Sequence, residues 1–147
     1  MDSSTRDTHD IDEQVNDRDD RYNAFQEAVS QYLIRHKSVL DVLTKLQEAN
    51  ARVNRSVVKA VTSCGCIQVD AARQQLPSDI TYWEMKQYME THVDGSMCEQ
   101  CKEVLEAELG RNLFYLAALC DLFNFDFYDV IESERKRVTA LGVFNLT

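Results

Sequence analysis

Four of the five cysteines form two close pairs, Cys64 with Cys66 and Cys98 with Cys101, and 31 residues separate the pairs. Four thiolates that converge can surround one metal ion tetrahedrally, which is the arrangement of a structural zinc site. The spacing therefore predicts zinc bound by these four residues. The fifth cysteine, Cys120, falls on an apolar helical stripe and is predicted to be a core residue.

The same cysteines leave other chemistry open. Cys98-x-x-Cys101 resembles a thioredoxin-type dithiol, although the strand-helix-strand context of that motif is absent. An iron–sulfur cluster, disulfides and unligated buried thiols are further alternatives. His92, six residues before Cys98, is an alternative ligand, or simply a solvated residue near a helix end. His9 and His36 have no predicted partners, so we expect no Cys/His catalytic arrangement.

The elements that would position the cysteines are predicted to be helices. The chain has 4 glycines and 1 proline in 147 residues, and its apolar residues recur at spacings of three and four. This pattern is typical of an all-α fold, and we predict no strand. Helices are expected over about 20–35, 39–63, 81–91, 96–123 and 126–141, with residues 67–80 as the main loop.

Helix-end signals place both cysteine pairs at helix termini. Gly65 can adopt the left-handed conformation that closes a helix, so the second helix should end between Cys64 and Cys66. Thr81 with Glu84, and likewise Ser96 with Glu99, fits a capping box that starts a helix. If the two long helices pack antiparallel, the end of one meets the start of the other, and the four cysteines converge.

Apolar periodicity also predicts which helix faces are buried. Residues 113–123 are apolar nearly all round and are predicted to form the central buried helix. Asn50, Asn54 and Asn112 are expected to form a buried hydrogen-bonded set, or else to line a vestigial nucleotide pocket. The predicted core stripes are Tyr22, Phe25, Val29, Tyr32 and Leu33; Val39, Leu43, Leu46, Asn50, Val53, Val57 and Ala60; and Leu105, Leu109, Asn112, Leu116, Cys120 and Phe123.

Residues 106–123, which begin Glu-Ala-Glu-Leu-Gly-Arg-Asn-Leu, and the following 126–131 resemble the MazG-like family of all-α nucleoside-triphosphate pyrophosphohydrolases. The resemblance extends over about 105–138 and more weakly over 39–62. It implies a bundle of about five helices, assembly into a homodimer or larger oligomer, a nucleotide ligand and magnesium-dependent hydrolysis.

The chain departs from this family at the magnesium ligands. The resemblance implies Glu-Glu-x-x-Glu on one helix and Glu-x-x-Asp on the next, but only Glu48 and Glu108 remain as candidate catalytic residues. Arg111 stands where the aspartate should be, and is predicted to form an ion pair with Glu108. Together with Arg52, Arg55 and Lys59, it could instead bind phosphate without a metal.

Three functions therefore remain open. The first is a noncatalytic or weakly active MazG-like domain with structural zinc that acts as an interaction or regulatory module. The second is a magnesium-dependent nucleoside triphosphate pyrophosphohydrolase that uses Glu48 and Glu108. A thiol redox sensor at Cys98 and Cys101 is a third hypothesis.

Charge and hydropathy limit the partners. The chain has 25 acidic and 16 basic residues, a net charge of −9, and residues 1–20 hold 8 of the acids but only 2 of the bases. We therefore expect a disordered acidic tail over 1–19 and one helical domain over 20–147. The acidic balance argues against nucleic acid as a partner. With no apolar run long enough for a membrane span and no secretion signal, the chain is expected to be cytoplasmic.

Overall fold

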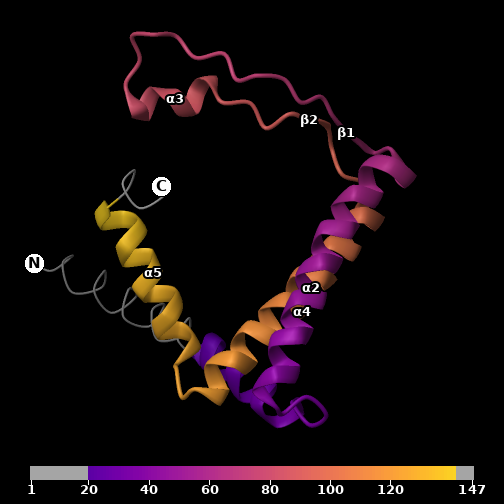
Figure 1. The fold of residues 1–147 in the computed structure, drawn as a ribbon, viewed down its shortest axis with the longest axis vertical. Helices are drawn as coiled ribbons and strands as arrows, with labels where there is room; N and C mark the ends of the chain where they lie inside the picture. The colour runs from indigo at the N-terminus through magenta and orange to yellow at the C-terminus, as the bar shows by residue number, and fades with distance from the viewer. Residues whose placement is uncertain (1–19, 142–147) are drawn as a thin grey trace, which may run out of the picture. The chain divides into compact units, whose positions relative to one another are not determined.

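The computed structural model describes residues 20–141, and mostly as helix. The predicted disordered tail, residues 1–19, and the chain end, 142–147, lie outside the described residues. After a helical segment over 20–32, the elements are α2 (Val39–Lys59), a π-helical turn η1 (Ala60–Cys64), β1 (Ile67–Val69), α3 (Tyr82–Tyr88), β2 (Val93–Gly95), α4 (Glu99–Leu122) and α5 (Phe127–Leu141) (Figure 1). This composition confirms the all-α class, apart from one short strand pair.

The chain divides into two compact units. Of the described residues, 20–46 and 113–141 belong to the first unit, and 47–112 belong to the second. The long helices α2 and α4 each contribute one part to each unit. The cysteine pairs all fall in the second unit, whereas Cys120 falls in the first.

The first unit has a small apolar core. Its buried side chains are Val29, Leu33, Val42, Ala117, Ala118 and Phe127. The rings of Phe25 and Phe127 lie 5.9 Å apart between centroids, which joins the segment 20–32 to α5. The alanines at 117 and 118 present little side-chain bulk, so the neighbouring segments can pack closely on α4.

A glutamine side chain fixes the start of α5. Gln26 donates from Nε2 to the Phe125 carbonyl at 2.8 Å, and its Oε1 accepts from the Phe127 N–H at 2.8 Å. The Asp126 carboxylate accepts from the Asp129 N–H at 3.0 Å, as expected of an N-cap residue. The predicted start of the last helix at Asp126 is therefore confirmed.

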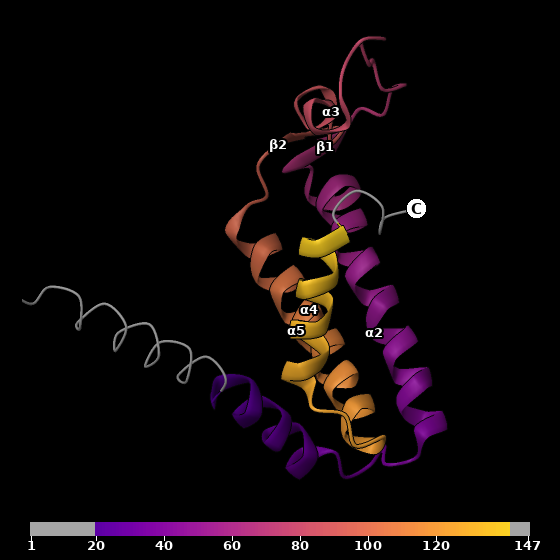
Figure 2. The ribbon, with the colours of Figure 1, turned by 90° about the vertical axis from the view of Figure 1, so that its left-hand side faces the viewer.

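In the second unit, α2 ends as predicted. Gly65 has φ 72° and ψ 14°, and its N–H donates to the Ala60 carbonyl through the π-helical turn. The chain then forms β1, which pairs antiparallel with β2 in the register Ile67 opposite Gly95 and Val69 opposite Val93 (Figure 2). The prediction of no strand is wrong here, because an alternation over only three residues is shorter than the four to eight residues that identify a strand.

The helix boundaries around α3 and α4 differ from the predicted ones. The capping box of Thr81 and Glu84 is confirmed, but α3 ends at Tyr88 rather than near 91. The reason is Gln74, whose side-chain amide binds the N–H and the carbonyl of Glu90 at 2.9 and 2.8 Å. The predicted capping box at Ser96 is wrong, because α4 begins three residues later, at Glu99.

The predicted core faces of the long helices are only partly correct. On α2 the buried residues are Val42, Ala49 and Ser56, so the buried face lies one residue away from the predicted stripe. Of the predicted core-stripe residues in the described part of the chain, the following are exposed instead: Tyr22, Tyr32, Leu43, Asn50, Val57, Leu109, Leu116 and Phe123. Residues 113–123 do not form a central buried helix, since Leu113 is 47% and Phe123 is 57% exposed. The apolar residues of these helices outnumber the positions that so small a core can cover.

The predicted asparagine set is not formed. Asn50 and Asn54 are exposed and Asn112 is half-buried, so they make no shared buried network. No helix in residues 20–141 combines the length and the apolar character that crossing a membrane requires.

Candidate metal centre

The four predicted cysteines converge at one end of the second unit. The Sγ atoms of Cys64, Cys66, Cys98 and Cys101 all lie within 4.8 Å of one another, and those of Cys64 and Cys98 are 3.8 Å apart. A tetrahedral site with Zn–S bonds of about 2.3 Å has sulfur atoms about 3.8 Å apart. The cluster therefore matches the size of a single four-coordinate site. Within residues 20–141 it is the one group of three or more side chains close enough to hold a metal ion.

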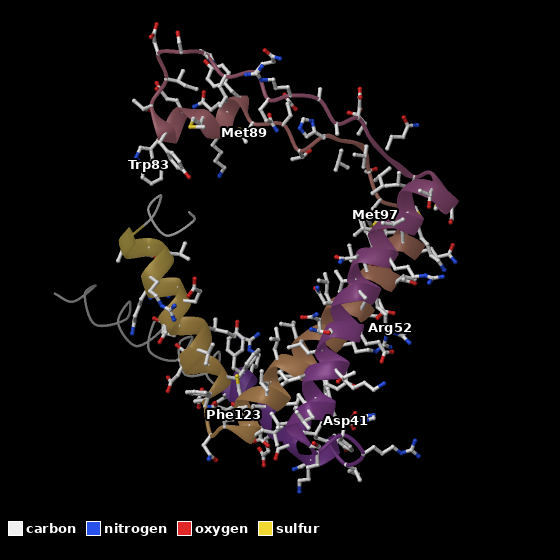
Figure 3. The ribbon with its side chains drawn as sticks, in the orientation of Figure 1. Asp41, Arg52, Trp83, Met89, Met97 and Phe123 are labelled. Carbon is white, nitrogen blue, oxygen red and sulfur yellow. The ribbon has the colours of Figure 1, made fainter. Side chains whose placement is uncertain are left out.

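Local structure on both sides brings the two pairs together. Cys64 ends the π-helical turn, and Gly65 then reverses the chain so that Cys66 immediately precedes β1. The pairing of β1 with β2 brings the chain back beside Cys66 at Gly95, three residues before Cys98. Gly95 at the end of β2 has φ 85°, and a Cβ there would lie only 3.0 Å from the Cys66 carbonyl oxygen. In Figure 3, the labelled Met97 marks this junction, directly before Cys98.

The start of α4 stabilises a thiolate. Cys98 occupies the N-cap position, and the backbone N–H of Cys101 donates to its sulfur, which together with the neighbouring thiols lowers the pKa of Cys98 from 9.0 to about 7. The hydrogen bond that Cys101 makes to Cys98 raises the pKa of Cys101 to about 12. At Cys64 the hydrogen bond with Cys101 lowers the pKa, but those with Cys66 and Cys98 outweigh it, so the pKa is raised.

These opposite shifts have one physical cause. Without a cation, four sulfur atoms this close together cannot all be thiolates, because their negative charges would repel one another. The thiols that stay protonated donate hydrogen bonds to the neighbouring sulfur atoms. A divalent cation at their centre would replace those protons and compensate the charge. The arrangement is therefore suited to metal binding.

None of the five cysteines is in a disulfide. The 3.8 Å between the Cys64 and Cys98 sulfur atoms is far longer than an S–S bond of about 2.05 Å. Cys120 lies apart from the cluster and packs against the core of the first unit, as predicted. Burial, and then the charge of Asp126, raises the pKa of the Cys120 thiol.

The histidines do not join the metal cluster. His92 is not part of it, and its Nε2 lies 3.0 Å from the Nε2 of Gln74. His36 was expected to have no partner, but its Nδ1 lies 2.6 Å from the Asp41 carboxylate. The prediction for His36 is therefore wrong, because Asp41 lies in the first turn of α2, within reach of the His36 ring. His9 lies outside the described residues.

The two candidate magnesium ligands, Glu48 and Glu108, are linked through an arginine. Arg52 lies 3.3 Å from the Glu48 carboxylate and 3.7 Å from that of Glu108, and so bridges α2 and α4. Arg111 donates to Glu108 at 2.5 Å, which confirms the predicted ion pair within α4. Two guanidinium groups thus occupy the carboxylate oxygens that a magnesium ion would need.

Sequence reasoning missed the strand pair that supports the cysteines. The segment Ile67-Gln68-Val69 alternates apolar and polar residues with β-branched side chains, and this was the available signal. Comparisons with protein-family models, with curated proteins and with solved structures find no match to this chain.

Proposed function

We propose that the chain is a noncatalytic, zinc-bound helical domain of the MazG-like type that acts as an interaction or regulatory module. The observation that supports it best is the convergence of four cysteine sulfur atoms within 4.8 Å at the junction of α2, the strand pair and α4. All four positions around the ion would be protein ligands, which is typical of structural rather than catalytic zinc. Four thiolates also suit an iron–sulfur cluster, so the metal must be identified directly. Unpaired thiols are in keeping with the cytoplasm.

The need for a metal follows from the segment between the cysteine pairs. We call residues 67–97 the arm, all of which the structure describes. Ile67 is the one residue of the arm that is buried. Ordering a chain costs about 1–2 kcal/mol per residue, and the arm has almost no core to offset this. A metal that closes the base of the arm would supply the missing stabilisation.

The ion pairs of the candidate magnesium ligands favour the noncatalytic alternative. Two magnesium ions with a triphosphate need several free carboxylate oxygens, whereas Glu108 is held by Arg52 and Arg111. The enzymatic alternative, a magnesium-dependent nucleoside triphosphate pyrophosphohydrolase using Glu48 and Glu108, would first have to displace both guanidinium groups.

Elemental analysis of the purified chain, with an assay of pyrophosphate release from nucleoside triphosphates and magnesium on the same sample, tests the proposal. We expect about one zinc ion per chain and no magnesium-dependent hydrolysis. Iron with an absorbing cluster, or no metal at all, would overturn the zinc assignment. Steady hydrolysis that is lost in Glu48→Gln or Glu108→Gln would make the enzymatic alternative the correct one.

Exposed apolar surface supports the interaction role. Leu109, Leu113 and Leu116 follow one another along α4 at helical spacing and are 37–47% exposed. In the middle of the arm sequence, α3 has no buried residue, and Trp83 is 75% exposed (Figure 3). Apolar side chains left uncovered in this way are typical of protein interfaces. We propose that the leucine stripe of α4 binds a second copy of the chain.

Replacing Leu113 with lysine is therefore expected to convert a homodimer, or a larger homo-oligomer, into a monomer. The introduced charge would be buried without a partner in the interface. Sedimentation equilibrium measures the mass, and circular dichroism checks that the helices remain. Val138→Lys is the matched control, since Val138 is 46% exposed but belongs to α5 and not to the leucine stripe of α4. A monomeric wild-type chain would contradict the proposed self-association.

A further inference from the structure

A cavity of about 360 Å³ lies between α2 and α4 within the second unit. Its lining residues are Arg52, Arg55, Ser56, Lys59, Val104 and Glu108. Figure 3 shows the labelled Arg52 on this stretch of α2. The volume falls within the range of small-molecule sites, about 300–1,000 Å³.

The cavity is positively charged, although the chain as a whole has a net charge of −9. Its lining contains three cations and one carboxylate. The carboxylate of Glu108, only 16% exposed, is already held by Arg52 and Arg111. Arg55 and Lys59 form no salt bridge with any residue between 20 and 141, so their charges are available to a ligand.

The positions of the cations define the charge pattern of that ligand. Arg52, Arg55 and Lys59 are spread over two turns of α2, or about 10 Å along the helix axis. One phosphate group is too small to reach all three, whereas two or more linked phosphate groups can. Arginine binds phosphate oxygens with two parallel hydrogen bonds, and lysine binds them as a point charge.

The remaining lining residues add no competing chemistry. The Ser56 hydroxyl donates to the Val53 carbonyl at 2.7 Å, so its proton is already used. Val104, 49% exposed, provides an apolar wall against which a carbon framework could pack. No carboxylate of the cavity is free to hold a magnesium ion beside the phosphates.

We propose that this cavity binds a small molecule with two or more phosphate groups, through Arg55 and Lys59 and without a magnesium ion. The site goes beyond the proposed zinc-bound role and does not depend on which metal the cysteines hold. It also differs from a hydrolase centre, because protein cations rather than metal ions neutralise the phosphates.

Titration calorimetry of the metal-loaded full chain with inorganic pyrophosphate, without added magnesium, tests this site. We expect binding at 50 mM salt that weakens at 200 mM salt, because salt screens the attraction between the cations and the pyrophosphate. Inorganic phosphate should bind at least tenfold more weakly than pyrophosphate. Arg55→Gln with Lys59→Gln should also weaken pyrophosphate binding about tenfold or more, with metal content and helicity unchanged, since both side chains are exposed.

The matched control is Arg73→Gln with Lys86→Gln, which removes the same charge from exposed positions outside the cavity. Its affinity for pyrophosphate should stay within twofold of the wild type. No binding at millimolar pyrophosphate, equal losses in the two double variants, or binding that requires added magnesium would each overturn the inference. The calorimetry is independent of the elemental analysis, so either proposal can fail without the other.

Discussion

Replacing Cys64 and Cys101 with serine is expected to release the bound metal and to lower the melting temperature by about 10 °C or more. Each cysteine pair then keeps one ligand, and two thiolates hold zinc far more weakly than four. Structural zinc contributes about 10–16 kcal/mol in small zinc domains. Loss of even half of that, about 5–8 kcal/mol, at about 2–4 °C per kcal/mol lowers the melting temperature by about 10 °C or more.

The loss should be local at first. The cysteines close the base of the arm, and Ile67 is its one buried residue, so amide hydrogens of residues 67–97 should exchange much faster in the double variant. Residues 20–46 and 113–141, which have the core of the first unit, should keep their protection. Hydrogen exchange followed by mass spectrometry measures both regions in one experiment.

Cys120→Ala is the matched control for this prediction, because Cys120 is the one cysteine outside the cluster. It should retain the full metal content, with only a small change in melting temperature from the lost packing. If Cys64→Ser with Cys101→Ser melts like the wild type, the structural role of the metal is wrong. If Cys120→Ala releases the metal as well, the assignment of the four ligands is wrong.

The cysteine site could be predicted from the sequence because the signals that position it are local. Gly65 marks a helix end whatever the rest of the chain does, and a Cys-x-x-Cys pair near a helix start brings two sulfur atoms together by itself. The convergence of both pairs required only that the two long helices run antiparallel. The strand pair also supports the site, but its sequence pattern is an alternation over only three residues, Ile67 to Val69.

The buried face of α2 could not be predicted in the same way. Val42 and Leu43 are neighbours of similar apolar character, and so are Val57 and Val58, so the sequence permits more than one apolar stripe. Packing selects the stripe through Val42 and leaves Leu43 44% exposed. The bridge from Arg52 to Glu108 likewise depends on the register between two helices, and it joins residues 56 positions apart in sequence, which no local pattern encodes.

Replacing Phe127 with alanine is expected to lower the free energy of unfolding by about 3–4 kcal/mol. Phe127 is 7% exposed and packs in the core of the first unit, where its ring also faces that of Phe25. Removal of a buried phenylalanine costs the transfer free energy of the ring and leaves a cavity, about 3–5 kcal/mol in total. Since small domains are stable by only about 5–15 kcal/mol, urea denaturation followed by circular dichroism should detect the loss easily.

Phe125→Ala separates this core effect from a general effect of removing an aromatic ring. Phe125 lies two residues away and is 60% exposed, and its contact with Gln26 is made by the backbone carbonyl, which alanine retains. Its substitution should therefore change the free energy of unfolding by no more than about 0.5 kcal/mol. Equal losses in the two variants would show that Phe127 is not the centre of a packed core. Retention of the metal in Phe127→Ala, measured on the same samples, would show that the cysteine site persists when the core of the first unit is weakened.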